Sequence, residues 1–296
     1  MTRLEKDDIG QITRQLDAYD ARLRRMTGAS LRQIACRAAG VDEARIVDLL
    51  DQVRFAAIPV TTGLGVIDGF SAAVATIISH LGFVAFATEL SDDAGIAEAI
   101  EKRADILMLA DDDRFIAQHR GGRQVVDNSS ATARGFVAGL ELMKGSLADE
   151  WVLVLGCGPV GIAAAEALID RGASVALCDT RQERALLALR KVGKNASSQD
   201  CSNRIRFEEA ALAALERYDL IFDATDVGHF IESAHLTART MVAAPGMPCA
   251  LTAEAMAEYR DRILHDALEI GTATMAVQAT ANLAGQVEAE KAENER

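Results

Sequence analysis

The sequence has few cysteines, no apolar run long enough to cross a membrane and no excess of basic residues. Its five cysteines are an odd number, widely spaced and without a CxxC pair, so we expect neither a disulfide framework nor a metal site. The longest apolar runs have the length of a strand, and the opening residues MTRLEKDDIG lack the apolar core of a secretory signal. These absences favour a cytoplasmic protein.

The charge balance excludes further classes of partner. Lysine and arginine number 31 and aspartate and glutamate 44, which gives a formal net charge of −13. A surface of this sign argues against nucleic acid and against an anionic membrane as partner. It suits a cationic small molecule, although many acidic enzymes are simply well solvated.

The 296 residues are enough for two domains, each with its own core. The chain is helical in pattern to about residue 50 and then alternates between strands and helices, which predicts an α/β fold with parallel sheets. We expect a substrate-binding and catalytic α/β domain at 1–147, a Rossmann dinucleotide-binding domain at 148–275, and a C-terminal helix with a charged tail at 276–296. The segment KGSLADE would be the hinge.

A glycine motif opens the second domain. The segment LGCGPVG follows an apolar strand pattern and begins a helix, and it places Gly156, Gly158 and Gly161 in the spacing GxGxxG. In this context the glycines permit a tight turn, close approach of a diphosphate to the backbone, and close packing of helix on strand. The residues predicted to bind the cofactor here are Gly156, Cys157, Gly158, Pro159, Val160 and Gly161.

Asp179 ends the next predicted strand and indicates which cofactor is used. A carboxylate at this point can hold the ribose hydroxyls and repel a 2′-phosphate, so we expect NAD rather than NADP. Arg181 acts against this preference because it could receive a 2′-phosphate. Two later strand ends, DATD and PGMP, should reach the same edge of the sheet, which adds Ala224, Thr225, Pro245 and Gly246 to the cofactor site. Thr225 could equally cap its own loop.

The stretch ILMLADDDRF delivers three carboxylates, Asp111, Asp112 and Asp113, to the end of an apolar strand. They could form a solvated turn, or they could hold a cation. We expect Asp113 to cap the turn and leave Asp112 open.

Other polar residues follow strand patterns in the first domain. The loop TTGLGVIDG offers Thr61, Thr62 and Gly63 as donors to a substrate carboxylate, or it is a glycine-rich turn and no more. Asn128 and Thr132 stand at the start of a helix, where they could face a cleft or cap that helix. His265 is a weaker cleft candidate.

Six segments together resemble one family, the PylD family of pyrrolysine-forming dehydrogenases. In chain order they are PVTTGLGVIDGFS, LMLADDDRF, VVDNSSATARGF, LGCGPVG, AAPGMP and HDALEIGTATM, and the resemblance spans roughly residues 4–276. It implies NAD-dependent oxidation of the terminal amine of an isopeptide of lysine and 3-methylornithine. The resulting imine then loses ammonia by hydrolysis to give an aldehyde, and the ornithine α-amine condenses with this aldehyde and loses water to close the ring of pyrrolysine.

The resemblance also implies roles for individual residues. Asp111 matches the aspartate that ends the family's third strand motif, and a carboxylate there could hold the reacting ammonium and take its proton. Leu4 lies on the opening helix, which would cover the substrate. The chain departs from the family pattern at Asp226 and Ala267, where prolines are usual, and in an extra loop at 194–204.

Two other functions remain open at this point. The chain could be another Rossmann amine or amino-acid dehydrogenase, because the glycine motif and Asp179 would be unchanged. It could also sense NAD without catalysis. The sequence leaves a homodimer open.

Overall fold

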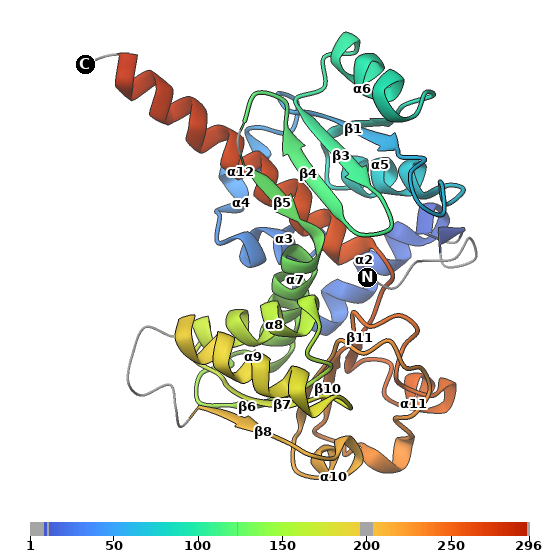
Figure 1. Cartoon of the computed structure of the whole chain (residues 1–296), viewed down its shortest axis with the longest axis vertical. Coiled ribbons are helices and arrows are strands. Elements are labelled where there is room, and N and C mark those ends of the chain that lie inside the picture. Colours follow the sequence, from blue (N-terminus) through green and yellow to red (C-terminus); the bar gives the residue numbers. More distant parts are fainter. Residues whose placement is uncertain (1–8, 11, 123, 196–203, 295–296) are drawn as a thin grey trace.

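The computed structural model describes residues 9–10, 12–122, 124–195 and 204–294. It contains two sheets, one in the upper and one in the lower part of the view in Figure 1, with helix α7 (Asn128–Lys144) between them. The α/β class predicted from the sequence is confirmed. The lower sheet carries the strand order of a Rossmann fold, as described below.

The first sheet follows three N-terminal helices, α2 (Ile12–Thr27), α3 (Leu31–Ala39) and α4 (Glu43–Val47). Its elements are β1 (Arg54–Pro59), α5 (Phe70–His80), β2 (Val84–Ala87), α6 (Asp92–Glu101), β3 (Ile106–Ala110), β4 (Phe115–His119) and β5 (Val125–Asp127). The strand order is β2-β1-β3-β4-β5.

This sheet is parallel only over β2, β1 and β3, whereas β4 and β5 run antiparallel. The expectation of a parallel sheet throughout this domain was therefore wrong for its last two strands. The reason is the short turn at 111–114: it joins β3 directly to β4, and a parallel connection would need a crossover of a dozen or more residues.

The second sheet is fully parallel in the order β11-β10-β9-β6-β7-β8. Read from the other edge, this is the 3-2-1-4-5-6 order of the doubly wound dinucleotide-binding fold. Its elements are β6 (Trp151–Leu155), α8 (Pro159–Asp170), β7 (Ser174–Cys178), α9 (Gln182–Asn195), β8 (Ile205–Phe207), α10 (Ala211–Leu215), β9 (Leu220–Asp223), the 3-10 turn η2 (Ser233–His235), β10 (Met241–Ala243), α11 (Ala253–Glu258) and β11 (Ile263–Leu264).

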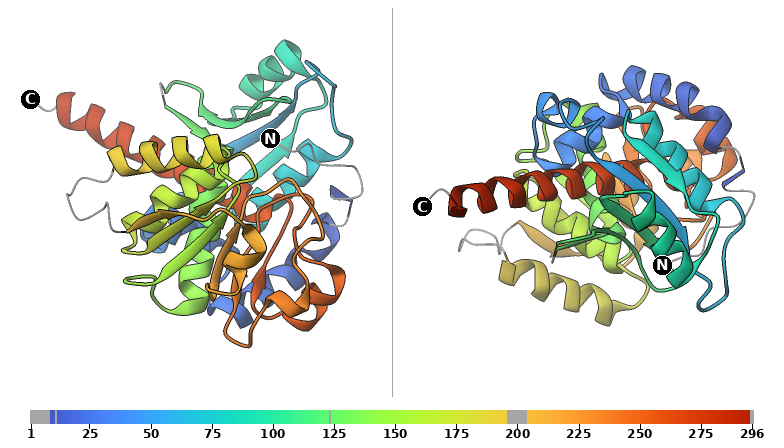
Figure 2. Two further views of the ribbon diagram at one scale, coloured as in Figure 1. Left: turned by 60° about the horizontal axis from the view of Figure 1, so that its bottom comes forward. Right: turned by 90° about the horizontal axis from the view of Figure 1, so that it is seen from above.

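The last helix, α12 (Glu269–Asn294), leaves the second sheet and returns to the first, where it packs mainly against α3 and α7. Both views in Figure 2 show its C-terminal end projecting from the body of the molecule. The helix begins at Glu269, before the predicted boundary at residue 276. The domain boundaries predicted from the sequence remain a proposal. Within the described parts of the chain, no helix has both the length and the apolar character needed to cross a membrane.

Helix α2 also joins the two halves of the molecule. The Tyr19 hydroxyl donates a hydrogen bond of 2.5 Å to Asp266 Oδ2, which follows β11. One turn later, the Arg22 guanidinium donates to the carbonyl oxygens of Ile263, at 2.7 Å, and Arg260, at 3.0 Å. The N-terminal helical layer is thus fastened to the far edge of the second sheet.

Candidate active site

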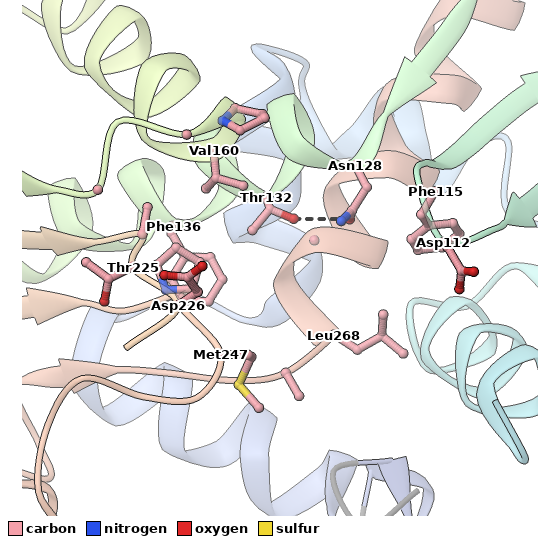
Figure 3. A pocket seen from close by; sticks show the side chains of 18 of the residues that line it. Asp112, Phe115, Asn128, Thr132, Phe136, Val160, Thr225, Asp226, Met247 and Leu268 are labelled. Carbon is pink, nitrogen blue, oxygen red and sulfur yellow. Dashed lines mark hydrogen bonds between the residues drawn. The ribbon is translucent and has the colours of Figure 1, made fainter. Parts of the chain in front are cut away.

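One cavity of about 890 Å³ lies where the two halves meet. Its walls come from the ends of β1 and β3 in the first sheet and from the ends of β6, β7, β9 and β10 in the second. The first turns of α5, α7, α8 and α12 complete it (Figure 3). Ligands of open α/β sheets bind at the carboxyl ends of strands, which is where this cavity lies.

The glycine motif has the geometry that a diphosphate requires. Gly156 has a φ of +85°, and a Cβ there would lie 2.6 Å from the Ala224 carbonyl oxygen. A Cβ on Gly161 would lie 1.8 Å from the Gly156 carbonyl oxygen. In contrast, a Cβ on Gly158 would meet nothing within 4 Å. Gly156 and Gly161 therefore allow close backbone packing. Gly158 leaves open space at the N-terminus of α8, where a diphosphate fits.

Cys157 and Asp179 are joined by a hydrogen bond beside this loop. The Cys157 amide donates to Asp179 Oδ2 at 2.8 Å, and the Arg181 amide donates to Asp179 Oδ1 at 2.8 Å. Asp179 borders the cavity, whereas the Cys157 side chain does not. Burial raises the pKa of the Cys157 thiol to about 12, so it stays protonated. Cys157 therefore contributes its backbone, and the Asp179 carboxylate is held in place at the cavity wall.

The remaining predicted cofactor residues mostly reach the same cavity. Those that border it are Gly156, Gly158, Pro159, Val160, Ala224, Thr225, Pro245 and Gly246. Gly161 lies behind the wall. Thr225 has the capping role as well, because its hydroxyl donates to Asp223 Oδ1 at 2.7 Å. Asp223 is fully buried, and its burial raises its pKa to about 6.

Asp111 borders the cavity and also stabilises the turn between β3 and β4. Its Oδ1 accepts the amides of Asp113, at 2.9 Å, and Arg114, at 2.7 Å. The turn-capping role expected of Asp113 thus belongs to Asp111, while the exposed Asp113 does not border the cavity. Asp111 thus stabilises a turn and also lies at the rim of the cavity. The two interpretations of the aspartate run, a turn and a cation-holding site, therefore do not exclude each other.

The loop after β1 borders the cavity through a different part from the one predicted. Gly65, Val66 and Ile67 line it, and Thr61, Thr62 and Gly63 do not. The Thr61 amide and hydroxyl both donate to Asp92, at 2.8 and 2.5 Å, which turns this residue away.

Gly63 lies against Asp112 instead, since a Cβ on this glycine would be 2.0 Å from Asp112 Oδ2. Asp112 also accepts the Leu64 amide at 2.5 Å, so its carboxylate holds the loop and lines the cavity at the same time. Donors for a substrate carboxylate therefore do not come from Thr61 to Gly63 in this arrangement.

Asn128 and Thr132 border the cavity from the first turn of α7, and the Thr132 hydroxyl donates to Asn128 Oδ1 at 3.1 Å (Figure 3). Gly271 of α12 packs directly on them, because a Cβ there would lie 2.4 Å from Thr132 Oγ1. Asp127 caps α7 by accepting the Ser129 amide. Asn128 and Thr132 are thus not needed as the cap. Leu4 lies outside the described residues, as does most of the loop at 194–204.

Several cavity residues were missed from the sequence. Apolar side chains include Phe70, Phe115, Phe136, Met247 and Leu268, and charged ones include Arg184, Glu209 and Asp266. Of these, Asp266 could have been proposed as a cavity residue from the sequence, because it directly follows a short strand pattern beside His265. His265 itself does not border the cavity, and its Nδ1 lies 2.6 Å from the Ala244 carbonyl oxygen.

The strand order and the glycine loop define a protein with the doubly wound dinucleotide-binding fold. The structure resembles quinate dehydrogenase from Corynebacterium glutamicum, solved in complex with NAD, with a TM-score of 0.53, 16% identity and coverage of 78% of this chain and 93% of that one. It also resembles shikimate dehydrogenase from Aquifex aeolicus, with a TM-score of 0.52, 14% identity and coverage of 77% and 92%. At these identities the likeness shows the fold.

The family follows from sequence. Residues 8–126 match the family described as pyrrolysine biosynthesis protein PylD, N-terminal domain. Pyrrolysine synthases of Methanosarcina barkeri and Methanosarcina acetivorans are each 28% identical over 276 residues, which cover 93% of this chain and 97% and 98% of theirs. These matches confirm the resemblance to the PylD family that was seen in the sequence.

Proposed function

We propose that the chain is a pyrrolysine-forming dehydrogenase that oxidises the terminal amine of an isopeptide of lysine and 3-methylornithine. The observation that carries this proposal is a single cavity in which a dinucleotide cradle from one half faces carboxylates from the other. The near full-length match to two pyrrolysine synthases supports the substrate. A cation-holding carboxylate suits an amine, which is protonated near neutral pH.

NAD fits the described residues and supplies the acceptor for the hydride. Gly156 and Gly158 with the first turn of α8 would hold its diphosphate, and Asp179 would hold its adenosine ribose. The Asp179 carboxylate favours a cofactor without a 2′-phosphate.

Asp111 is the residue we assign to the reacting amine. An ammonium group cannot give up hydride from its carbon until one proton has left the nitrogen, because the nitrogen lone pair forms the new C=N bond. The Asp111 carboxylate would bind the ammonium and accept that proton, directly or through a water. It would then stabilise the iminium ion by its charge. Water adds to the iminium carbon and ammonia leaves, which gives the aldehyde. The α-amine of the ornithine part condenses with it and water is lost.

The test is turnover of the synthetic isopeptide. Purified protein with NAD⁺ and this substrate should produce NADH, one ammonia per NADH, and pyrrolysine detected by mass spectrometry. NADH from a simple amino acid, but none from the isopeptide, would instead favour another amine dehydrogenase. NAD binding without turnover of any amine would favour a sensing protein.

A further inference from the structure

The turn between β11 and α12 brings a buried acidic pair to the cavity wall. Asp266 lines the cavity together with Ala267, Leu268 and Gly271. Asp266 and Glu269 are each only 8% exposed, although both carry a carboxyl group. Burying two carboxylates without a strong partner is costly, so a fold that keeps both has a use for them or holds a proton there.

The contacts of the pair fix its geometry. Asp266 accepts the Tyr19 hydroxyl at 2.5 Å and the Ile270 amide at 3.3 Å, and Glu269 accepts the Leu268 amide at 3.0 Å. Each of the two carboxyl groups also influences the pKa of the other. Among the residues that the structure describes, no lysine or arginine forms an ion pair with either.

The guanidinium of Arg22, whose charge lowers the pKa of Tyr19, is hydrogen-bonded to the backbone carbonyls of Ile263 and Arg260. The pair is therefore held by neutral donors and by itself. The positions of the two carboxyl groups are thus fixed by neutral hydrogen-bond donors, and a ligand can supply the positive charge that these donors do not provide.

The pair shares a proton near neutral pH. Burial, together with the charge of the neighbouring Asp266, raises the pKa of Glu269 to about 8. Burial also raises the pKa of Asp266, against the donors that stabilise its charge. Tyr19 stays protonated because burial and the two carboxyls raise its pKa well above its usual value. One carboxyl of the pair is thus protonated while no cation is present.

The pair lies beside the substrate half of the cavity. Gly271, two residues after Glu269, packs on Thr132 and Asn128: its Cβ would lie 2.4 Å from Thr132 Oγ1 and 3.0 Å from Asn128 Oδ1. The dinucleotide cradle, in contrast, lies on α8 and β7. A ligand that reaches Asp266 from the cavity would therefore be the substrate.

We infer that Asp266, backed by Glu269 and Tyr19, binds a second ammonium group of the substrate. The inference rests on the proposed function, because the proposed isopeptide carries further amines besides the one assigned to Asp111. The proton balance is simple. The substrate ammonium keeps its three protons, the pair gives one proton to solvent, and the bound ammonium offsets the negative charge that the pair gains by losing that proton.

Calorimetry tests this without turnover. Binding of the isopeptide at pH 7 would be measured in two buffers of different ionisation enthalpy, and the difference gives the number of protons released. We expect the wild type to release a substantial fraction of one proton and Glu269→Gln to bind while releasing close to none. Ornithine and lysine serve as simpler probes of the same site. Absence of proton release from the wild type with every ligand that binds would overturn the inference.

Kinetics separates binding from chemistry. Asp266→Asn should raise KM for the isopeptide about 10- to 100-fold, the range that follows from losing a charged hydrogen bond, and should change kcat less. Tyr19→Phe should raise KM by a smaller factor, whereas Tyr259→Phe, which removes a hydroxyl bonded to the Leu236 carbonyl, should not. A wild-type KM in Asp266→Asn would refute the assignment.

Failure of the proposed function has a different signature. Wild-type protein that makes no NADH from the isopeptide, yet releases protons on binding ornithine or lysine, would refute the function and retain the cation site. Thermal unfolding of each variant shows whether it is folded. If Asp266→Asn does not fold, the number of protons released by Glu269→Gln on ligand binding, compared with the wild type, still tests the inference.

Discussion

At the scale of single residues, Asp111 combines a structural contact with the chemistry we assign to it. Its Oδ1 holds the turn by accepting the amides of Asp113 and Arg114, and its side chain borders the cavity. An asparagine in its place keeps an oxygen that can accept both amides, but it has neither charge nor basicity. Asp111→Asn therefore separates the two roles, which an alanine would remove together.

We predict that Asp111→Asn lowers turnover of the isopeptide by about 10²–10⁴, the usual loss when a positioned general base is removed. NAD binding should be unchanged, because the nucleotide cradle lies on the other half of the molecule. Steady-state NADH production and NAD titration measure the two effects. Asp113→Asn is the matched control and should behave like the wild type, since this carboxylate is exposed and does not border the cavity. Near wild-type turnover in Asp111→Asn would leave Asp111 as a turn residue only.

Asp179 is the residue that we expect to set the preference between NAD⁺ and NADP⁺. We predict that the wild type prefers NAD⁺ over NADP⁺ and that Asp179→Ser weakens this preference, because the 2′-phosphate is then no longer repelled. Arg181 and Arg184 border the cavity nearby and could receive that phosphate once the carboxylate is gone. The ratio of kcat/KM for the two cofactors measures the change. Equal use of both by the wild type would contradict the assignment.

At the scale of elements, the strand-to-helix turn of the second half was predictable and the first half was less so. The spacing GxGxxG requires a strand before it and a helix after it, and β6 and α8 supply both. Strand β4 was missed, because whether a short polar turn reverses the chain depends on side-chain contacts such as those of Asp111. The roles of Thr61 and Gly63 were hidden for the same reason, since their partners Asp92 and Asp112 lie 31 and 49 positions further along the chain.

The three glycines of the motif should respond differently to substitution. Gly158→Val should abolish NAD binding in a chain that still folds, because its Cβ points into open space that the diphosphate would fill. Gly161→Val should instead destabilise the fold, because its Cβ would lie 1.8 Å from the Gly156 carbonyl oxygen. Calorimetric NAD titration and thermal unfolding of both variants test this contrast. Unchanged NAD affinity in Gly158→Val would count against the site.

At the scale of the whole molecule, the cavity is assembled by segments from both ends of the chain. Helix α2 reaches the second sheet through Tyr19 and Arg22, and α12 returns from that sheet to the first. The sequence showed both helices, but no periodicity in either one reveals that Tyr19 meets a residue 247 positions away. The contact between Tyr19 and Asp266 could not be predicted for this reason. The surroundings of Asp266 exist only when both ends of the chain are folded.

The shared proton of Asp266 and Glu269 should be visible in the stability of the whole protein. The pKa of Glu269 is about 8 in the folded protein, against about 4.3 for an unperturbed glutamate. Between these values the folded protein holds a proton that the unfolded chain has lost. The stabilisation is therefore fully present below about pH 4.3 and is lost as the pH rises through about 8.

We thus predict that the wild-type free energy of unfolding falls more steeply between pH 5 and pH 8 than that of Glu269→Gln, whose amide cannot titrate. The slopes should differ by up to one proton, about 1.4 kcal/mol per pH unit. Urea unfolding at one-unit steps of pH, without cofactor or substrate, measures both curves. Glu258→Gln, at an exposed position of α11, is the matched control and should follow the wild type. Parallel curves for the wild type and Glu269→Gln would mean that the buried pair does not hold the proton on which the second ammonium site depends.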